Sequence, residues 1–174
     1  HSLRRRQRQM CIRDRNHEFE VWYQPKINLL DDAVVGAEAL IRWRDPVKGL
    51  ISPAEFIPLA ENTGLIIQIG EQVIDSVCGD IRRWIDRGVL HGVIAVNVAA
   101  LQIDRSDFVE TIKTALEDYG LPATVLEVEV TESLMMASPT HSREVLSTLQ
   151  SLGVTTAIDD FGTGYSSLAY LKLL

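Results

Sequence analysis

The stretch VVGAEALIRW, residues 34–43, places one acid, Glu38, in the middle of an apolar run that is typical of a β-strand. Strand alternation puts Gly36, Glu38, Leu40 and Arg42 on one face. A lone carboxylate in such a run is costly unless it is paired or binds a metal ion. The planar Arg42 guanidinium is suited to a phosphate group. The stretch therefore predicts a strand that carries part of a functional site.

On both sides of this stretch, strand-like and helix-like segments alternate along the chain, which predicts a mostly parallel sheet covered by helices. No GxGxxG motif follows the first strand, which disfavours a dinucleotide-binding fold. About five strands are present, so the sequence predicts an α/β protein with an incomplete (β/α)8 TIM-type barrel. Strands are expected over residues 19–29, 34–43, 93–100, 125–131 and 154–158, and helices over 53–63, 69–87, 108–119, 139–152 and from 166 onward.

Composition is that of an ordinary globular domain, with 174 residues, 46% hydrophobic and 24% charged. No apolar run approaches the roughly 20 residues of a membrane span. Cys11 and Cys78 provide neither a disulfide framework nor a zinc motif. Cys78 falls on an apolar helix face and is expected to be a buried structural thiol. A reducing, cytoplasmic location fits this cysteine usage.

The first 15 residues, HSLRRRQRQMCIRDR, differ from the rest in carrying six Arg and one Asp. They could be a solvated basic tail or an arm for nucleic acid or membrane. Residues 5–14 also resemble the translation of a transposon-type sequencing adapter, so we treat 1–15 as non-native and 16–174 as the domain. Residues 16–174 alone have a formal charge of −12, whereas the whole 174-residue chain has −7. Such an acidic domain is a poor candidate for nucleic-acid binding.

Polar residues gather where the predicted parallel strands end, at the edge that forms active sites in α/β folds. Oxygen donors of this kind select Mg²⁺ or Mn²⁺, and two such ions are a recurrent solution for phosphodiester hydrolysis. Spacing cannot decide between Glu127 and Glu129, Asn97 could instead cap a strand, and the two Asp residues could instead belong to a turn. The candidate donors are Glu38, Asn97, Glu129, Asp159 and Asp160.

Six motifs in order resemble the EAL domain family, the bacterial cyclic di-GMP phosphodiesterases, from about Phe19 to Leu174. They are YQP at 23–25, GAEALIRW at 36–43, ISP at 51–53 leading to FIPLAE at 56–61, VN at 96–97, EVTES at 129–133 and DDFGTGYSS at 159–167. Val98-Ala99 is a mild departure, since the family more often has Leu-Ser there.

The resemblance implies a (β/α)8-type barrel with one antiparallel strand and Mg²⁺- or Mn²⁺-dependent hydrolysis of cyclic di-GMP to linear pGpG. It makes Glu38, Asn97, Glu129 and Asp159 metal ligands, with Asp160 serving the second metal. It also implies that Gln24, Leu40 and Arg42 contact the substrate and that a homodimer could form through the 160–167 loop. Other domains of such proteins can attach them to a membrane, although this chain has no membrane segment.

The family's catalytic Lys and a further Glu ligand are expected beyond Leu174, so 16–174 is expected to be a partial domain and its catalytic residue is unknown. Lys172 lies too early for that role and is expected to face solvent on a helix. The alternative function is a non-catalytic module that binds cyclic di-GMP or a protein partner.

We expect no phosphodiesterase activity from the 174-residue chain itself, because the barrel would be left open at its strand edges. The assay is the release of pGpG from cyclic di-GMP with Mn²⁺ present, and detectable turnover would contradict the expectation.

Overall fold

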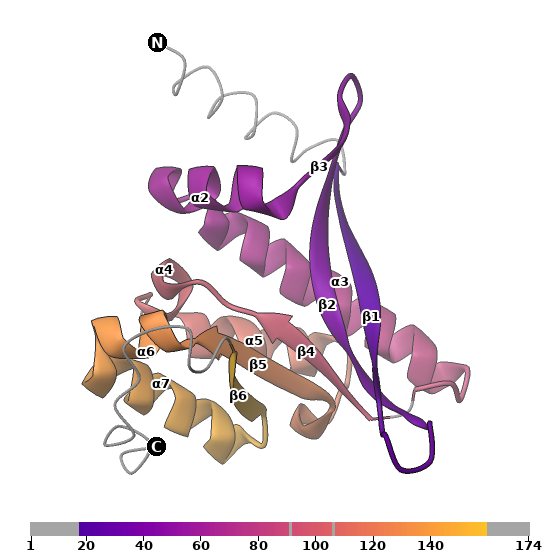
Figure 1. The fold of residues 1–174 in the computed structure, drawn as a ribbon. Coiled ribbons are helices and arrows are strands. Elements are labelled where there is room, and N and C mark those ends of the chain that lie inside the picture. The colour runs from indigo at the N-terminus through magenta and orange to yellow at the C-terminus, as the bar shows by residue number, and fades with distance from the viewer. Residues whose placement is uncertain (1–17, 91, 106, 160–174) are drawn as a thin grey trace.

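The computed structural model describes residues 18–90, 92–105 and 107–159, so the 1–15 segment and the expected helix from residue 166 lie outside the described residues. The described part is one six-stranded sheet with helices packed on it (Figure 1). Its elements are β1 (Phe19–Ile27), β2 (Val34–Asp45), β3 (Gly49–Ile51), α2 (Pro53–Thr63), α3 (Ile66–Asp86), β4 (Val93–Asn97), α4 (Ala100–Ile103), α5 (Phe108–Asp118), η2 (Ala123–Val125), β5 (Leu126–Thr131), α6 (Glu132–Ala137), α7 (Pro139–Leu152) and β6 (Thr155–Asp159).

The strand order is β1-β2-β4-β5-β6, and the short β3 pairs with β2 outside this path. Strands β2, β4, β5 and β6 run parallel, whereas β1 pairs with β2 in the antiparallel direction. Parallel neighbours joined through helices, with one antiparallel strand at the start, are the arrangement expected of a partial (β/α)8-type barrel. The predicted fold class is therefore confirmed.

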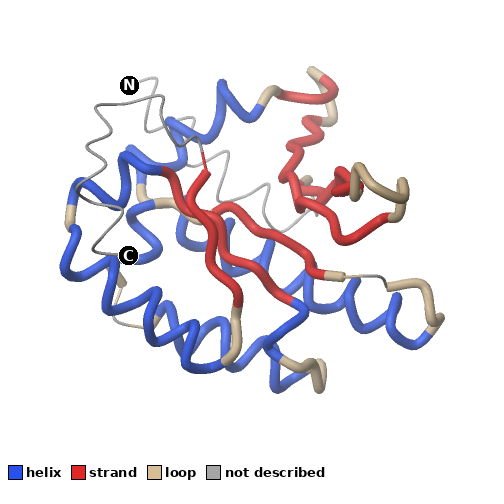
Figure 2. The backbone as a smooth tube through the Cα atoms, turned by 60° about the horizontal axis from the view of Figure 1, so that its bottom comes forward, coloured by secondary structure: helices blue, strands red, loops and turns tan. Residues whose placement is uncertain are grey.

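One face of the sheet is apolar and forms the main core. Ile94, Val96, Val128 and Val130 are almost fully buried there against the apolar sides of α3, α5 and α7. These three helices lie along the same side of the strands (Figure 2). Because strand side chains alternate, the residues between these apolar positions point to the opposite face. That opposite face carries the predicted site.

A second core cluster fixes α2 on the extended end of β2. Trp43 and Phe56 meet edge to face with ring centroids 5.7 Å apart, and Ile51 of β3 lies in the same cluster. Aromatic pairs of this kind stabilise packing beyond the area that they bury. The cluster holds α2 beside the strand that carries Glu38.

The predicted helix ends agree with the structure, since Gly64 ends α2 and Gly153 ends α7, both in the left-handed backbone region. The expected strand over 93–100 instead stops at Asn97. The Gln102 side chain accepts a hydrogen bond from the Ala99 backbone N–H at 3.0 Å, which starts α4 where the strand was expected to continue. The short elements β3, α4, η2 and α6 were not predicted.

Cys78 is fully buried in the main core, as expected of a structural thiol. Burial, together with the charge of Asp75, raises the pKa of the Cys78 thiol to about 12. Within the described ranges no helix is both long and apolar enough to cross a membrane.

Candidate metal and substrate site

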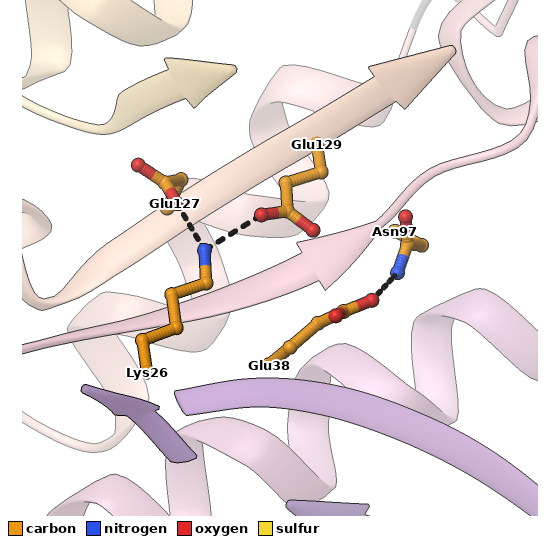
Figure 3. Close-up of polar contacts among 5 residues, drawn as sticks. All are labelled: Lys26, Glu38, Asn97, Glu127 and Glu129. Carbon is orange, nitrogen blue, oxygen red and sulfur yellow. Dashed lines mark hydrogen bonds and ion pairs between the residues drawn. The ribbon is translucent and has the colours of Figure 1, made fainter. Parts of the chain in front are cut away.

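Three of the predicted metal ligands lie on neighbouring strands and on the same face of the sheet. In the pairing register, Asn97 of β4 stands opposite Glu129 of β5, and Glu38 of β2 stands opposite Ala95, two residues before Asn97. The Asn97 side-chain amide donates a hydrogen bond of 2.6 Å to Glu38 Oε1 (Figure 3). The structure thus brings an acid and an amide from two strands into contact beside a third donor.

Lys26 of β1 lies between two glutamates of β5. Its ammonium group donates hydrogen bonds of 2.8 Å to Glu127 Oε1 and 2.7 Å to Glu129 Oε1. Strands β1 and β5 are separated by β2 and β4, a span of about 14 Å in a flat sheet with strands about 4.8 Å apart. Side chains that stand perpendicular to a flat sheet could not meet across this span. The contact therefore shows that the polar face is concave, as the inside of a barrel is.

Glu129 is the better placed of the two glutamates that spacing could not separate. Figure 3 shows Glu129 between Lys26 and the Asn97–Glu38 pair, whereas Glu127 lies on the far side of Lys26. The geometry favours Glu129 as the ligand that would act together with Glu38 and Asn97.

The ionisation of this cluster follows from burial and from charge. Burial raises the pKa of Glu129, helped by the neighbouring acids Glu38 and Glu127, while the hydrogen bond and charge of Lys26 act in the opposite direction. Burial would by itself lower the pKa of Lys26, but its two glutamate partners outweigh it and the pKa is raised. Because a carboxyl group must lose its proton to bind a metal ion, metal binding at Glu129 is expected to weaken as the pH falls.

Asp159 ends β6, and its backbone pairs with Thr131 in the parallel register. This places Asp159 two residues beyond the level of Glu129 along the sheet. Within the described residues, no group of three or more His, Cys, Asp or Glu side chains is gathered closely enough to hold a metal ion. Asp160, the predicted partner of the second metal, lies outside the described residues.

The donor set nevertheless suits a hard cation. Glu38 and Glu129 supply carboxylate oxygens, and Asn97 can supply its amide oxygen if its side chain rotates, because its amide nitrogen now faces Glu38. Glu38 is half-buried and Glu129 is buried, so both would be only partly hydrated before binding. These three residues would hold the ion.

A cavity of about 520 Å³ adjoins this site. It is bounded by β2, α2 and α3 on one side and by the ends of β4, β5 and β6 on the other, and its walls are mostly apolar. Two predicted substrate contacts, Leu40 and Arg42, line it together with Asn97 and Asp159. A mostly apolar cavity with a few convergent polar groups is the usual form of a small-molecule site.

The third predicted substrate residue, Gln24, is placed differently. It stands opposite Glu38 in the β1–β2 register and is exposed, and it is not part of the cavity wall. Gln24 therefore borders the metal ligands instead of lining the cavity.

Two side chains near the site were not predicted from the sequence. Lys26 follows Gln24 by two positions and so shares its strand face, which was the available signal. Trp22 precedes Gln24 by two positions, and the Arg42 guanidinium lies over its ring, 5.7 Å from the centroid. A stacked guanidinium is restrained in orientation, which prepares Arg42 to receive a phosphate.

Known proteins resemble this chain along most of its length. The family model for the EAL domain matches residues 4–174. The bifunctional diguanylate cyclase/cyclic di-GMP phosphodiesterase MucR of Pseudomonas aeruginosa is 48% identical over 152 residues, which cover 87% of this chain and 22% of MucR. The cyclic di-GMP phosphodiesterase NbdA of the same species is 44% identical over 160 residues, covering 92% of this chain and 20% of NbdA. This chain thus spans about a fifth of the length of these relatives.

Solved structures lead to the same family. The structure of the PaMucR phosphodiesterase in complex with c-di-GMP superimposes with a TM-score of 0.89 at 44% identity, covering all of this chain and 69% of that one. The EAL enzyme Bd1971, bound to cAMP and cyclic-di-GMP, gives a TM-score of 0.89 at 34% identity, covering 98% of this chain and 47% of that one. The chain is a member of the EAL domain family.

Proposed function

We propose that this chain supplies the metal-binding and substrate-binding residues of a cyclic di-GMP phosphodiesterase, which hydrolyses cyclic di-GMP to linear pGpG by two-metal catalysis. One observation carries the proposal: Glu38, Asn97 and Glu129 converge on one concave face, next to a cavity that Arg42 lines. The relatives named as cyclic di-GMP phosphodiesterases support the same reaction.

Glu38, Asn97 and Glu129 would hold Mg²⁺ or Mn²⁺, and Asp159 and Asp160 extend the set toward a second ion. Metal ions in such a site activate water and stabilise charge on the phosphate. Glu38 and Glu129 contribute two negative charges, which offset those of a divalent ion. Before an ion binds, the amide nitrogen of Asn97 holds Glu38 in place through its hydrogen bond of 2.6 Å.

The cavity explains how a cyclic dinucleotide would be oriented. Its apolar walls, which include Leu40 and Ile57, can cover a base, while Arg42 can bind a phosphate with two parallel N–H donors. Leu40 and Arg42 stand two positions apart on β2, on the face that also carries Glu38. The strand thus connects phosphate binding to the metal ligands.

The Arg42→Ala variant is expected to bind cyclic di-GMP at least about tenfold more weakly than the wild-type chain, because a charge-assisted hydrogen bond contributes about 1.5–3 kcal/mol. Isothermal titration with cyclic di-GMP, with and without Mn²⁺, measures this. The matched control is Arg44→Ala, whose side chain lies on the same strand, pairs with Glu20 at 2.5 Å and does not line the cavity. Equal losses in both variants would contradict a phosphate contact at Arg42.

The reaction itself is tested on a protein that carries this chain within its EAL domain, by following pGpG release from cyclic di-GMP with Mn²⁺ present. Release that depends on the metal, and is lost in Glu38→Gln, is the expected result. Binding of cyclic di-GMP with no metal-dependent release would instead identify the non-catalytic binding module.

A further inference from the structure

Lys26 is a cation placed inside the proposed metal site. Its strand, β1, is separated from β5 by two strands, yet its ammonium group reaches both acids of β5 (Figure 3). Two small residues, Gly36 opposite Lys26 and Ala95 opposite Glu127, occupy the strands in between. Because Gly36 has no side chain and Ala95 has only a methyl group, the long Lys26 side chain can extend across this face of the sheet.

The two carboxylates that Lys26 contacts are well covered. The side chains of Glu127 and Glu129 are 19% and 11% exposed, and that of Lys26 is 38% exposed. The ammonium group lies 2.7–2.8 Å from both acids, and the burial of these acids leaves the two ion pairs less screened by water than pairs on the open surface. Lys26 therefore controls the charge that these carboxylates can offer to another cation.

Some carboxylate oxygens of the site bind Lys26, and others remain directed toward Asn97 and Glu38. Lys26 takes Glu127 Oε1 and Glu129 Oε1, and it stands between Glu127 and the Asn97–Glu38 pair (Figure 3). The hydrogen bond from Lys26 engages one oxygen of Glu129, and the second oxygen lies on the side of Asn97. One glutamate is thus held away from the pair, and the other keeps one oxygen directed toward it.

We propose that Lys26 is a positioning residue that reserves Glu127 and one oxygen of Glu129 for an internal ion pair, so that metal binds only through the other oxygen of Glu129 together with Glu38 and Asn97. This inference rests on the proposed metal site. The internal cation limits the affinity for a divalent ion, because the two positive centres share the Glu129 carboxylate. It also excludes Glu127 from the ligand set.

The Lys26→Met variant of the full chain tests the inference through the Mn²⁺ affinity, measured by isothermal titration on protein shown to be folded by circular dichroism. Removing one positive charge a few ångströms from the ion is expected to tighten Mn²⁺ binding by about tenfold. A residue with a merely structural role would give unchanged or weaker binding when removed, and either result would overturn the proposal.

A double-variant comparison tests the exclusion of Glu127. Glu127→Gln alone is expected to change the Mn²⁺ affinity by less than about threefold, whereas in the Lys26→Met background it should abolish most of the gain. An equal effect of Glu127→Gln in both backgrounds would overturn the exclusion. Lys26→Arg keeps the charge and should bind Mn²⁺ as the wild type does.

Lys113→Met is the control for net charge. Lys113 lies on α5, pairs with Glu110 at 3.6 Å and lies outside the site, so its loss should leave the Mn²⁺ affinity unchanged. The Mn²⁺ titrations distinguish an error in the proposed metal site from an error in the proposed role of Lys26. Absence of Mn²⁺ binding in the wild type overturns both, whereas wild-type binding that Glu38→Gln removes and Lys26→Met does not strengthen overturns the Lys26 role alone.

Discussion

Replacing Glu129 with glutamine is expected to weaken Mn²⁺ binding on the order of 100-fold, since even the residues that only support metal ligands are worth roughly 10 to 100-fold. The amide keeps the shape of the side chain but removes its negative charge. Glu129 is buried and stands opposite Asn97 in the register, whereas the other acid of β5, Glu127, stands opposite Ala95, two positions earlier. Isothermal titration of Mn²⁺ into the folded variant measures the loss.

Glu127→Gln is the matched control for this prediction. Glu127 lies on the same strand and face, makes the same kind of contact with Lys26, and differs in being farther from the Asn97–Glu38 pair. The ligand assignment requires that Glu127→Gln bind Mn²⁺ within about threefold of the wild type. If Glu127→Gln lost Mn²⁺ binding and Glu129→Gln kept it, the two assignments would have to be exchanged.

The strand that carries Glu38 could be predicted because its information is local. Alternation in VVGAEALIRW fixes which side chains share a face of the sheet. As this pattern requires, the structure places Glu38 on one face and the buried Ala39 on the other. The helix ends could also be predicted, since Pro53, Gly64 and Gly153 each have backbone preferences that act within a few residues. Convergence of Asn97 and Glu129 followed from the rule that parallel strands end at one edge.

The role of Lys26 could not be predicted from the same patterns. Its partner Glu129 lies 103 positions away along the chain, on a strand that is not its neighbour. Only the curvature of the sheet brings the two together, and curvature is a property of the whole sheet. The choice between Glu127 and Glu129 depended on which of them lies beside Asn97 and Glu38, and spacing along β5 does not contain that relation between strands.

The early end of β4 illustrates a competition that local patterns do not resolve. Val98 and Ala99 are compatible with a strand, but the Gln102 side chain binds the Ala99 N–H and starts a helix. Gln102 can reach this position because Gly70 of α3 has no side chain, and a Cβ there would overlap with the Gln102 amide. The position of the segment that follows Asn97 thus depends on a glycine in another helix.

Replacing Gly92 with alanine is expected to destabilise the fold by more than about 3 kcal/mol, which corresponds to a fall in Tm of about 6–12 °C for a domain of this size. Gly92 has φ +95°, a conformation that costs an L-residue roughly 1–2 kcal/mol. In addition, a Cβ at Gly92 would overlap with the Val35 carbonyl oxygen, which belongs to the neighbouring strand β2. Relief of this overlap would have to separate the starts of β2 and β4.

The Gly88→Ala variant separates the cost of the backbone conformation from the cost of the overlap with the neighbouring strand. Gly88 has φ +66°, but a Cβ there would meet nothing within 4 Å, so only the backbone cost of roughly 1–2 kcal/mol applies. Thermal unfolding followed by circular dichroism should therefore give a clearly smaller loss for Gly88→Ala than for Gly92→Ala. Equal losses would mean that the close approach of β4 to β2 is not needed for stability. Because this approach sets the register that brings Asn97 to Glu38, folded Gly92→Ala protein should also bind Mn²⁺ more weakly.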